Sequence, residues 1–286
     1  MPAKLLDGKA LAARINKTLS EEISLLRSGR KRSPKLVSVQ AGNDPASEAY
    51  LVSQRKSAES LGIEYIAERL DIDISRDKLI DVIEKFNKDR TVSGIIVQMP
   101  LPAHVDAKSI PGYISPLKDV EALNPRNMGE MVFGKARMFP CTAAACMELL
   151  NSIGPLDLYG KEAVIVGHSE IVGKPLALML LNKFVTVTVC HIATSERGSL
   201  SEFVKRAEIL IVACGKACLI KGEWIRKDAI VIDVGINRVD GKIVGDVDFE
   251  AACEKASYIT PVPGGVGPLT TAMLMRNVVE AFKSQI

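Results

Sequence analysis

Two stretches of the chain combine residue types that can do chemistry. The first follows four small apolar residues at 163–166 with Gly167, Ser169 and Gly173, and then a second apolar run at 175–181. A buried strand, a glycine turn and a helix in this order leave free backbone N–H groups that can bind a phosphate. The spacing differs from the common Gly-x-Gly-x-x-Gly fingerprint, so an ordinary connection between a strand and a helix is the alternative interpretation.

The second stretch is a segment with helical spacing, residues 47–62, in which Tyr50 and Gln54 are four residues apart and share a face. The tyrosine ring can stack on a flat ligand, or it can be a half-buried helix residue. The Gln54 amide can hydrogen-bond a ligand but does not titrate near neutral pH, so it cannot act as a general acid or base. Gln98, in the apolar segment 93–99, offers a second amide, which can pair with Gln54 or bond within its own strand.

The composition is that of an ordinary globular protein and argues against several function classes. The chain has 286 residues, of which 47% are hydrophobic and 25% charged, which favours two domains. The net charge of +3 is too small to indicate a nucleic-acid partner. No apolar run is long enough to span a membrane and the first residues lack the apolar core of a signal peptide, so we expect a cytoplasmic protein. The six cysteines form no Cys-x-x-Cys pair and there are three histidines, so we expect free thiols and no metal site.

The elements that must position these residues begin with an alternation of helices and strands. Helices are expected at residues 11–26, 47–62 and 78–87, and strands at 35–39, 64–70 and 93–99. This alternation favours an α/β layer with parallel strands. Residues 111–138 are rich in glycine, proline and asparagine, so we expect a loop and linker there, followed by a helix at 142–153.

The second part of the chain alternates in the same way. Strands are expected at 163–166, 185–190, 209–213 and 229–234, and helices at 175–181, 200–207 and 270–282. Several strands are followed by glycine or small residues, which places their loops at the carboxyl edge of a parallel sheet. Ligands of such folds bind at that edge, so we expect the Gly167 turn to lie there.

Eight stretches, in this order along the chain, closely resemble the methylenetetrahydrofolate dehydrogenase/cyclohydrolase family. They are YLVSQRKSAESLGI (50–63), SGIIVQMPLP (93–102), KDVEALNP (118–125), PCTAAACMELL (140–150), GHSEIVGKP (167–175), VIDVGIN (231–237), GDVDF (245–249) and TPVPGGVGPLTTAML (260–274). The resemblance implies two α/β domains with a ligand cleft between them. Residues 1–140 plus 266–286 would form the folate-binding catalytic domain. Residues 141–265 would form a Rossmann-like doubly wound parallel sheet that binds a nicotinamide dinucleotide.

The resemblance also implies an activity. The protein would be an oxidoreductase that acts on tetrahydrofolate derivatives. It would belong to one-carbon metabolism, which supplies purine biosynthesis. It would oxidise 5,10-methylenetetrahydrofolate by hydride transfer to NADP, with NAD as the alternative cofactor. Many family members are multifunctional and hydrolyse the methenyl product as well. A cytoplasmic homodimer is implied, without a nucleic-acid, membrane or metal partner.

The site residues that the resemblance implies fall into three groups. The catalytic residues are Tyr50, Gln54 and Gln98. The substrate-binding residues are Tyr50, Val97, Gln98, Met99, Glu121, Pro263, Gly264 and Gly265. The cofactor-binding residues are Gly167, His168, Ser169, Ile171, Gly173, Ile192 and Ile236.

The chain departs from the family pattern at positions that carry chemistry. Gln54 stands where similar members have a proton-transferring lysine, so we expect hydride transfer to survive and the hydrolytic step to be weak or lost. Glu121 replaces the aspartate that anchors the pterin, and Ala122 replaces the glycine after it. His168 replaces an arginine that pairs with the 2′-phosphate of NADP. Two alternatives stay open, a fully bifunctional enzyme and a folate-binding paralogue without turnover.

Overall fold

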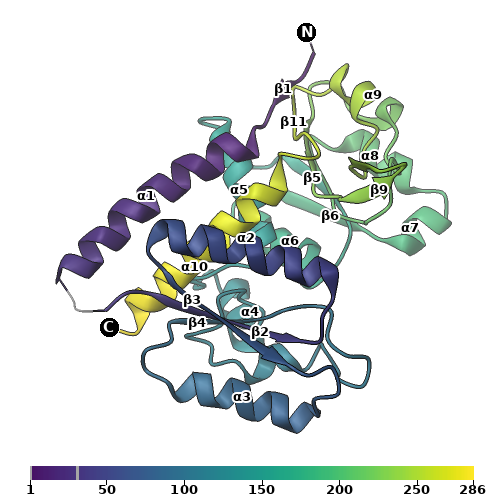
Figure 1. Cartoon of the computed structure of the whole chain (residues 1–286). Coiled ribbons are helices and arrows are strands. Elements are labelled where there is room, and N and C mark those ends of the chain that lie inside the picture. Colours follow the sequence, from purple (N-terminus) through teal and green to yellow (C-terminus); the bar gives the residue numbers. More distant parts are fainter. Residues whose placement is uncertain (1, 30–31) are drawn as a thin grey trace. The chain divides into compact units, whose positions relative to one another are not determined.

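The computed structural model describes residues 2–29 and 32–286, and the chain divides into two compact units. Unit 1 consists of Met1–Ala13 and Thr142–Thr270, and unit 2 of Arg14–Cys141 and Thr271–Ile286 (Figure 1). The sequence-based division kept residues 1–140 together, whereas the structure groups the first residues with unit 1. The reason is that β1 (Lys4–Leu5) pairs in parallel with β11 (Tyr258–Ile259).

Unit 2 contains a three-stranded sheet in the order β3-β2-β4, with all strands parallel. The strands are β2 (Lys35–Ala41), β3 (Glu64–Leu70) and β4 (Gly94–Val97). One face packs on α3 (Arg76–Lys88) through a buried cluster around Ile83. The opposite face packs through Leu36 on α2 (Pro45–Leu61) and α10 (Val266–Ser284), with α1 (Gly8–Gly29) alongside. The expected α/β layer with parallel strands is therefore confirmed.

Local chemistry sets the ends of these helices. α2 begins after Asp44, whose carboxylate accepts a hydrogen bond from the N–H of Ser47 at 2.9 Å. It stops at Gly62, whose φ of 77° lies in the left-handed region. α3 begins after Ser75, whose hydroxyl caps the helix in the same manner. Both helices lie where the periodicity of apolar residues placed them.

The expectation of a loop and linker at 111–138 is wrong, because the structure contains a short 3-10 helix at Ile110–Tyr113 and α4 at Pro125–Val132. Asn124 caps α4, since its side chain accepts a hydrogen bond from the N–H of Arg126 at 2.8 Å. A proline fills the first turn, where no hydrogen-bond donor is needed. The glycine and proline content concealed this helix, although asparagine followed by proline is itself a signal for a helix start.

Unit 1 is built on a six-stranded parallel sheet in the order β1-β11-β8-β7-β5-β6. Besides β1 and β11, its strands are β5 (Glu162–Val166), β6 (Thr186–Cys190), β7 (Ile209–Val212) and β8 (Ile230–Asp233). Within Thr142–Thr270 the chain forms β5 first, adds β6 on one side and then β7 on the other. In doubly wound sheets the ligand crevice lies outside the carboxyl ends of the strands at such a reversal. The predicted doubly wound sheet is thereby confirmed.

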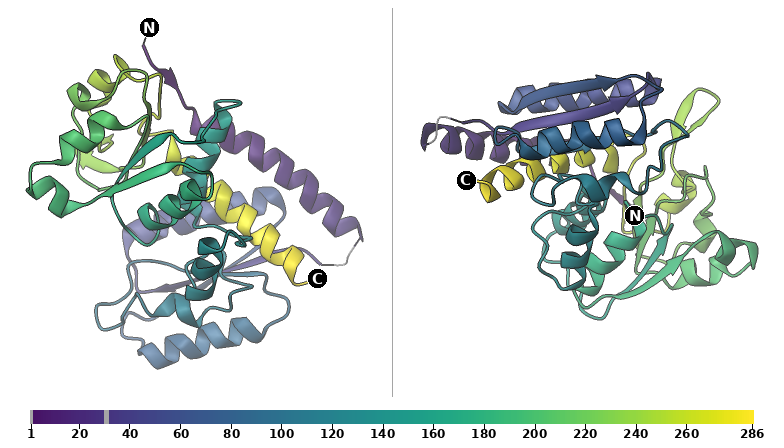
Figure 2. Two further views of the ribbon diagram at one scale, coloured as in Figure 1. Left: turned by 180° about the vertical axis from the view of Figure 1, so that it is seen from behind. Right: turned by 90° about the horizontal axis from the view of Figure 1, so that it is seen from below.

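Shorter elements flank and connect these strands (Figure 2). They are α5 (Cys141–Ser152), α6 (Gly173–Leu181), α7 (Ile192–Glu196), α8 (Leu200–Arg206), η2 (Gly222–Trp224), α9 (Phe249–Cys253) and the antiparallel hairpin of β9 (Asn237–Val239) and β10 (Lys242–Val244). The sequence did not predict β1, β11, α7, α9 or the hairpin, because each is too short to carry a periodic pattern. In the described part of the chain, no helix is long and apolar enough to cross a membrane.

One buried side chain of the unit 2 sheet leaves polar atoms unpaired. Gln40, on β2, is 2% exposed, and neither its amide oxygen nor its nitrogen has a hydrogen-bond partner among the described residues. Leaving a buried polar group unpaired costs about 1–3 kcal/mol. We therefore expect Gln40→Leu to raise the free energy of unfolding by about 1 kcal/mol, measured by urea unfolding.

Gln98→Leu is the matched control, because the amide nitrogen of this similarly buried glutamine donates two hydrogen bonds. That variant should unfold at a lower urea concentration than the wild type. If Gln40→Leu also unfolds at a lower concentration, the Gln40 amide has a stabilising partner and the expectation fails.

Candidate functional site

Four polar side chains of unit 2, which we call the amide cluster, form a hydrogen-bonded group under α2. Gln54 Oε1 accepts a hydrogen bond from Gln98 Nε2 at 2.9 Å and another from the Tyr65 hydroxyl at 3.2 Å. Gln98 Nε2 also donates to Ser38 Oγ at 2.8 Å. Burial raises the pKa of Tyr65 above its usual value, so the phenol stays neutral and can donate. The two amides are thus paired, as the sequence suggested.

The amide cluster is assembled from elements that are separate in sequence. Ser38 and Tyr65 lie on neighbouring parallel strands, Gln98 directly follows β4, and Gln54 reaches them from α2. Tyr50, one turn earlier on α2, is 55% exposed, so its ring is free to stack on a flat ligand. No sequence signal pointed to Ser38 or Tyr65, because the strand register that brings them to Gln54 is a tertiary property.

The two residues beside Gln98 differ in what they offer a ligand. The Val97 side chain is buried in the cluster that packs on α3, so only its main chain remains for a contact. Met99 is 46% exposed. Its carbonyl accepts a hydrogen bond from Ser47 Oγ at 2.7 Å, which ties the end of β4 to the start of α2. Met99 lies beyond the end of β4, outside the sheet in which Val97 is buried.

Glu121 lies in an acidic corner of unit 2. The neighbouring Asp119 is buried and accepts hydrogen bonds from the N–H of Asn124 at 2.7 Å and from Asn127 Nδ2 at 2.9 Å. Loss of solvent and the charge of Asp119 raise the pKa of Glu121 to about 8. At neutral pH its carboxyl is therefore mostly protonated and can both donate and accept. Ala122 has a φ of 56°, a left-handed conformation that glycine adopts without strain.

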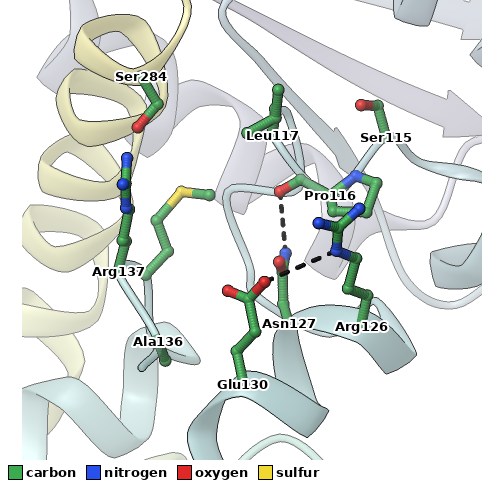
Figure 3. A pocket seen from close by; sticks show the side chains of 10 residues that line it. Ser115, Pro116, Leu117, Arg126, Asn127, Glu130, Ala136, Arg137 and Ser284 are labelled. Atoms are coloured by element: carbon green, nitrogen blue, oxygen red, sulfur yellow. Dashed lines mark hydrogen bonds and ion pairs between the residues drawn. The ribbon is translucent and has the colours of Figure 1, made fainter. Parts of the chain in front are cut away.

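A pocket of about 400 Å³ elsewhere in unit 2 is lined by none of the predicted site residues (Figure 3). Its lining residues are Ser115, Pro116, Leu117, Arg126, Asn127, Glu130, Ala136, Arg137, Met138 and Ser284. Arg126 Nε lies 3.6 Å from the Glu130 carboxylate, and Asn127 Nδ2 donates to the carbonyl of Pro116 at 3.0 Å (Figure 3). Because these polar groups pair with the protein itself, we place the candidate site at the amide cluster.

In unit 1, the turn after β5 has the backbone of a phosphate-binding loop. Gly167 has a φ of 125°, and a Cβ atom there would lie 2.2 Å from the carbonyl oxygen of Ala213. A Cβ atom on Gly173 would lie 2.0 Å from the carbonyl oxygen of Gly167. Side chains are therefore excluded at both positions. Ser169 Oγ accepts a hydrogen bond from the N–H of Val172 at 3.2 Å, and α6 begins directly after it, with first-turn N–H groups that can face an anion.

Histidines and isoleucines follow the strands at the same carboxyl edge of the sheet. His168 and His191 follow the neighbouring strands β5 and β6, and their ring centroids are 5.2 Å apart. Ile171, Ile192 and Ile236 are large exposed apolar side chains. Such side chains suit the flat rings of a dinucleotide, while the glycine turn suits its pyrophosphate. The residues present therefore fit a nicotinamide dinucleotide.

Two buried aspartates organise the loops at this edge, and sequence reasoning missed them. Asp246 accepts hydrogen bonds from the main-chain N–H groups of Cys214 and Gly215 at 2.8 and 2.9 Å. Asp233 accepts three main-chain hydrogen bonds, one of them from Asp246 at 3.0 Å. Burial raises the pKa of Asp233 to about 6 despite these donors. The two carboxyl groups thus join the loops that follow β7 and β8 to the segment after β10.

The remaining predicted residues, Pro263, Gly264 and Gly265, lie in the turn from β11 into α10. The N–H of Gly265 donates to the carbonyl of Pro261 at 2.8 Å and closes the turn. These three belong to unit 1, as do all the predicted cofactor residues, whereas Tyr50, Gln54, Val97, Gln98, Met99 and Glu121 belong to unit 2. Among residues 2–29 and 32–286, no group of three or more His, Cys, Asp or Glu side chains could hold a metal ion.

Comparisons with known proteins agree with this arrangement. Residues 6–121 match the family model of the tetrahydrofolate dehydrogenase/cyclohydrolase catalytic domain, and residues 140–286 match the NAD(P)-binding domain of the same family. The chain is 48% identical over 286 residues to the bifunctional protein FolD of Acetivibrio thermocellus, covering 100% of this chain and 99% of that protein. It is 46% identical over 284 residues to the bifunctional protein FolD of Bacillus pumilus, covering 99% of each.

Solved structures are similar over the same length. The bifunctional methylenetetrahydrofolate dehydrogenase/cyclohydrolase FolD of Campylobacter jejuni gives a TM-score of 0.95 at 44% identity, covering 99% of this chain and 100% of that one. The corresponding Trypanosoma brucei enzyme, solved with NADP and an inhibitor, gives a TM-score of 0.93 at 37% identity, covering 99% of this chain and 98% of that one.

The role of Asp246 in holding the unit 1 loops can be tested with Asp246→Asn. An amide nitrogen would face one or more of the N–H groups that the carboxylate accepts, so we expect a loss of about 1–3 kcal/mol in the free energy of unfolding. The main-chain amides of Cys214 and Gly215 should exchange faster with deuterium. Asp248→Asn is the control, because its side chain makes no helix-capping hydrogen bond. Equal exchange in both variants would remove Asp246 from this role.

Proposed function

Because the chain belongs to the tetrahydrofolate dehydrogenase/cyclohydrolase family, we propose that it is an NADP-dependent 5,10-methylenetetrahydrofolate dehydrogenase in which the cyclohydrolase step is weak or lost. One observation carries this proposal. Gln54, at the position of the family lysine, is a neutral amide hydrogen-bonded to Gln98 and Tyr65, while the glycine turn of the dinucleotide site is intact.

In the proposed reaction, unit 2 binds and orients the folate. The exposed Tyr50 ring stacks on a flat part of the ligand. Glu121 bonds the polar edge of the pterin, with a carboxyl group that can donate as well as accept at neutral pH. Gln54 and Gln98 bond the region of the bridging carbon, and Met99 and the main chain of Val97 line the site.

Hydride loss requires a cofactor and little proton chemistry from the protein. A bound nicotinamide dinucleotide supplies the hydride acceptor. Gly167, Ser169 and Gly173, with the first N–H groups of α6, would hold its pyrophosphate. Ile171, Ile192 and Ile236 would pack on its rings. His168 would contact the 2′-phosphate, and the Trypanosoma brucei relative solved with NADP supports NADP as the cofactor.

The hydrolytic step needs a group that moves protons, and neither Lys56 nor Lys118 replaces the missing lysine. Gln54 does not titrate near neutral pH. Lys56 lies two residues along α2, on a different side of the helix, and is exposed. Lys118 is buried, and its ammonium donates to the carbonyls of Phe86, Asn87 and Asp89. The relatives named bifunctional keep full bifunctionality as the second candidate function.

We further propose that the protein is a cytoplasmic homodimer. Support for the dimer comes from β6, which lies at the edge of the six-stranded sheet. Near its start, Tyr159 and Phe184 are exposed, with ring centroids 5.6 Å apart, and an unpaired edge strand beside exposed aromatic rings favours association. All six cysteines are free thiols, which fits a reducing compartment.

The proposal is tested by a time course with methylenetetrahydrofolate and NADP, following the methenyl product by its absorbance. We expect the product to accumulate and to decay at the rate of the buffer alone. Gln54→Lys should speed this decay at least about tenfold, because it restores a proton-transferring group, while hydride transfer changes less. Decay faster than the buffer rate in the wild type would establish the bifunctional alternative. No methenyl product with either NADP or NAD would establish a paralogue without turnover.

The role of His168 in cofactor choice is tested with His168→Arg. A guanidinium forms a stronger, permanently charged contact with the 2′-phosphate, so the ratio of kcat/KM for NADP to that for NAD should rise by about tenfold. His104→Arg, in unit 2, is the control for an added arginine and should leave the ratio unchanged. An unchanged ratio in His168→Arg would show that another residue binds the phosphate.

A further inference from the structure

Two hydrogen-bond donors of the amide cluster, from Tyr65 and Gln98, point at the amide oxygen of Gln54. From this we infer that Tyr65 and Ser38 are positioning residues that hold the Gln54 amide with its Nε2 donor toward the folate. Neither residue touches the ligand in this arrangement, and both act through Gln54 and Gln98. The inference rests on the proposed function, because the ligand it concerns is the folate bound at that site.

The direction follows from counting donors. Gln98 Nε2 has two N–H groups and uses both, one on Ser38 Oγ at 2.8 Å and one on Gln54 Oε1 at 2.9 Å. The Tyr65 hydroxyl has one proton and gives it to the same Gln54 oxygen at 3.2 Å. Two donors therefore converge on Gln54 Oε1. Turning this amide over would set its nitrogen against the Gln98 nitrogen, so that two donors face each other and a hydrogen bond is lost.

Ser38 completes the arrangement. Its side chain is fully buried and is also hydrogen-bonded to the Tyr65 side chain. Since Ser38 Oγ accepts from Gln98, its own proton is available to the Tyr65 oxygen, which leaves the tyrosine proton for Gln54. With the Gln98 amide oriented in this way, the protons of Ser38, Tyr65 and Gln98 each have an acceptor, and the Gln54 amide meets them with Oε1 toward Gln98 and Tyr65.

Two atoms are left over for a ligand. Gln54 Nε2 and Gln98 Oε1 have no hydrogen-bond partner among the described residues, and neither is one of the fully enclosed unpaired atoms, in contrast to the amide of Gln40. The site thus presents one donor and one acceptor and carries no charge. When a hydride leaves methylenetetrahydrofolate, the product is a cation shared by two nitrogens. A neutral amide does not repel this cation, whereas a lysine ammonium at the same place would.

Tyr65→Phe removes one of the two donors to Gln54 Oε1 without changing the shape of the side chain. We expect its dissociation constant for tetrahydrofolate, measured by titration calorimetry, to rise about fivefold, because the amide is no longer held in one orientation. Tyr113→Phe is the matched control. Its hydroxyl also lies in unit 2 and bonds Arg76, but it belongs to no part of the proposed site, so the dissociation constant should stay within about twofold.

Gln54→Glu separates positioning from packing. The glutamate keeps an oxygen where Tyr65 and Gln98 donate, but replaces the Nε2 donor with a second oxygen. We expect the variant to stay folded and to bind tetrahydrofolate about tenfold more weakly. If Tyr65 acts through that donor, adding Tyr65→Phe to Gln54→Glu causes no further loss of affinity. Losses that multiply in the double variant would show a structural role alone and would overturn the inference.

A ligand-free readout keeps the inference testable apart from the proposed function. In the wild type, the side-chain amide protons of Gln98 should exchange slowly by NMR, because both are bonded in the protein interior, while those of Gln54 should exchange fast. Slow exchange at Gln54 would mean the opposite orientation and would overturn the inference. If this pattern is found but the wild type does not bind tetrahydrofolate, the proposed function fails, and with it the assignment of folate as the ligand.

Discussion

Both units depend on one constraint, the parallel pairing of every strand in their main sheets. Parallel strands end at the same edge, so residues that follow different strands are gathered there without further contacts. In unit 1 this brings the Gly167 turn beside the loop after β7. The approach is so close that a Cβ atom on Gly167 would overlap the carbonyl oxygen of Ala213 in that loop. In unit 2 it sets Gln98, just past β4, beside Ser38 on β2. The direction of the strands thus determines which residues meet in each unit, and the types of their side chains then determine the chemistry.

The polar groups gathered at these edges are costly to bury, and the protein satisfies them in different ways. Asp233 and Asp246 accept main-chain hydrogen bonds and so fix the loops around them. The amide cluster pairs side chains with side chains, which fixes orientation more than stability. Gln40 has neither kind of partner in the part of the chain that the structure describes. Two polar residues two positions apart on β2, Ser38 and Gln40, therefore contribute in opposite directions to the stability of the same sheet.

The sequence predicted the elements whose patterns are long, and it predicted the family. The helix that became α2 and the strands of both sheets other than β1 and β11 were found from periodicity, and the Gly167 turn from its glycines. It failed at α4, where asparagine and proline look like a loop although they form a helix start. It also missed Tyr65, Asp233 and Asp246. Their partners are set by strand register and by main-chain donors, neither of which leaves a trace in residue type or spacing.

The neutral amide at Gln54 has a consequence for the direction of the reaction. Hydrolysis removes the oxidised product, and it thereby pulls the oxidation forward. A site that lacks this second step leaves hydride transfer close to equilibrium. The ratio of oxidised to reduced nicotinamide in the cell would then decide whether the protein oxidises or reduces its folate. A separate hydrolase would then have to open the cationic product with water. The rate of that hydrolysis would control how much of the product is carried forward.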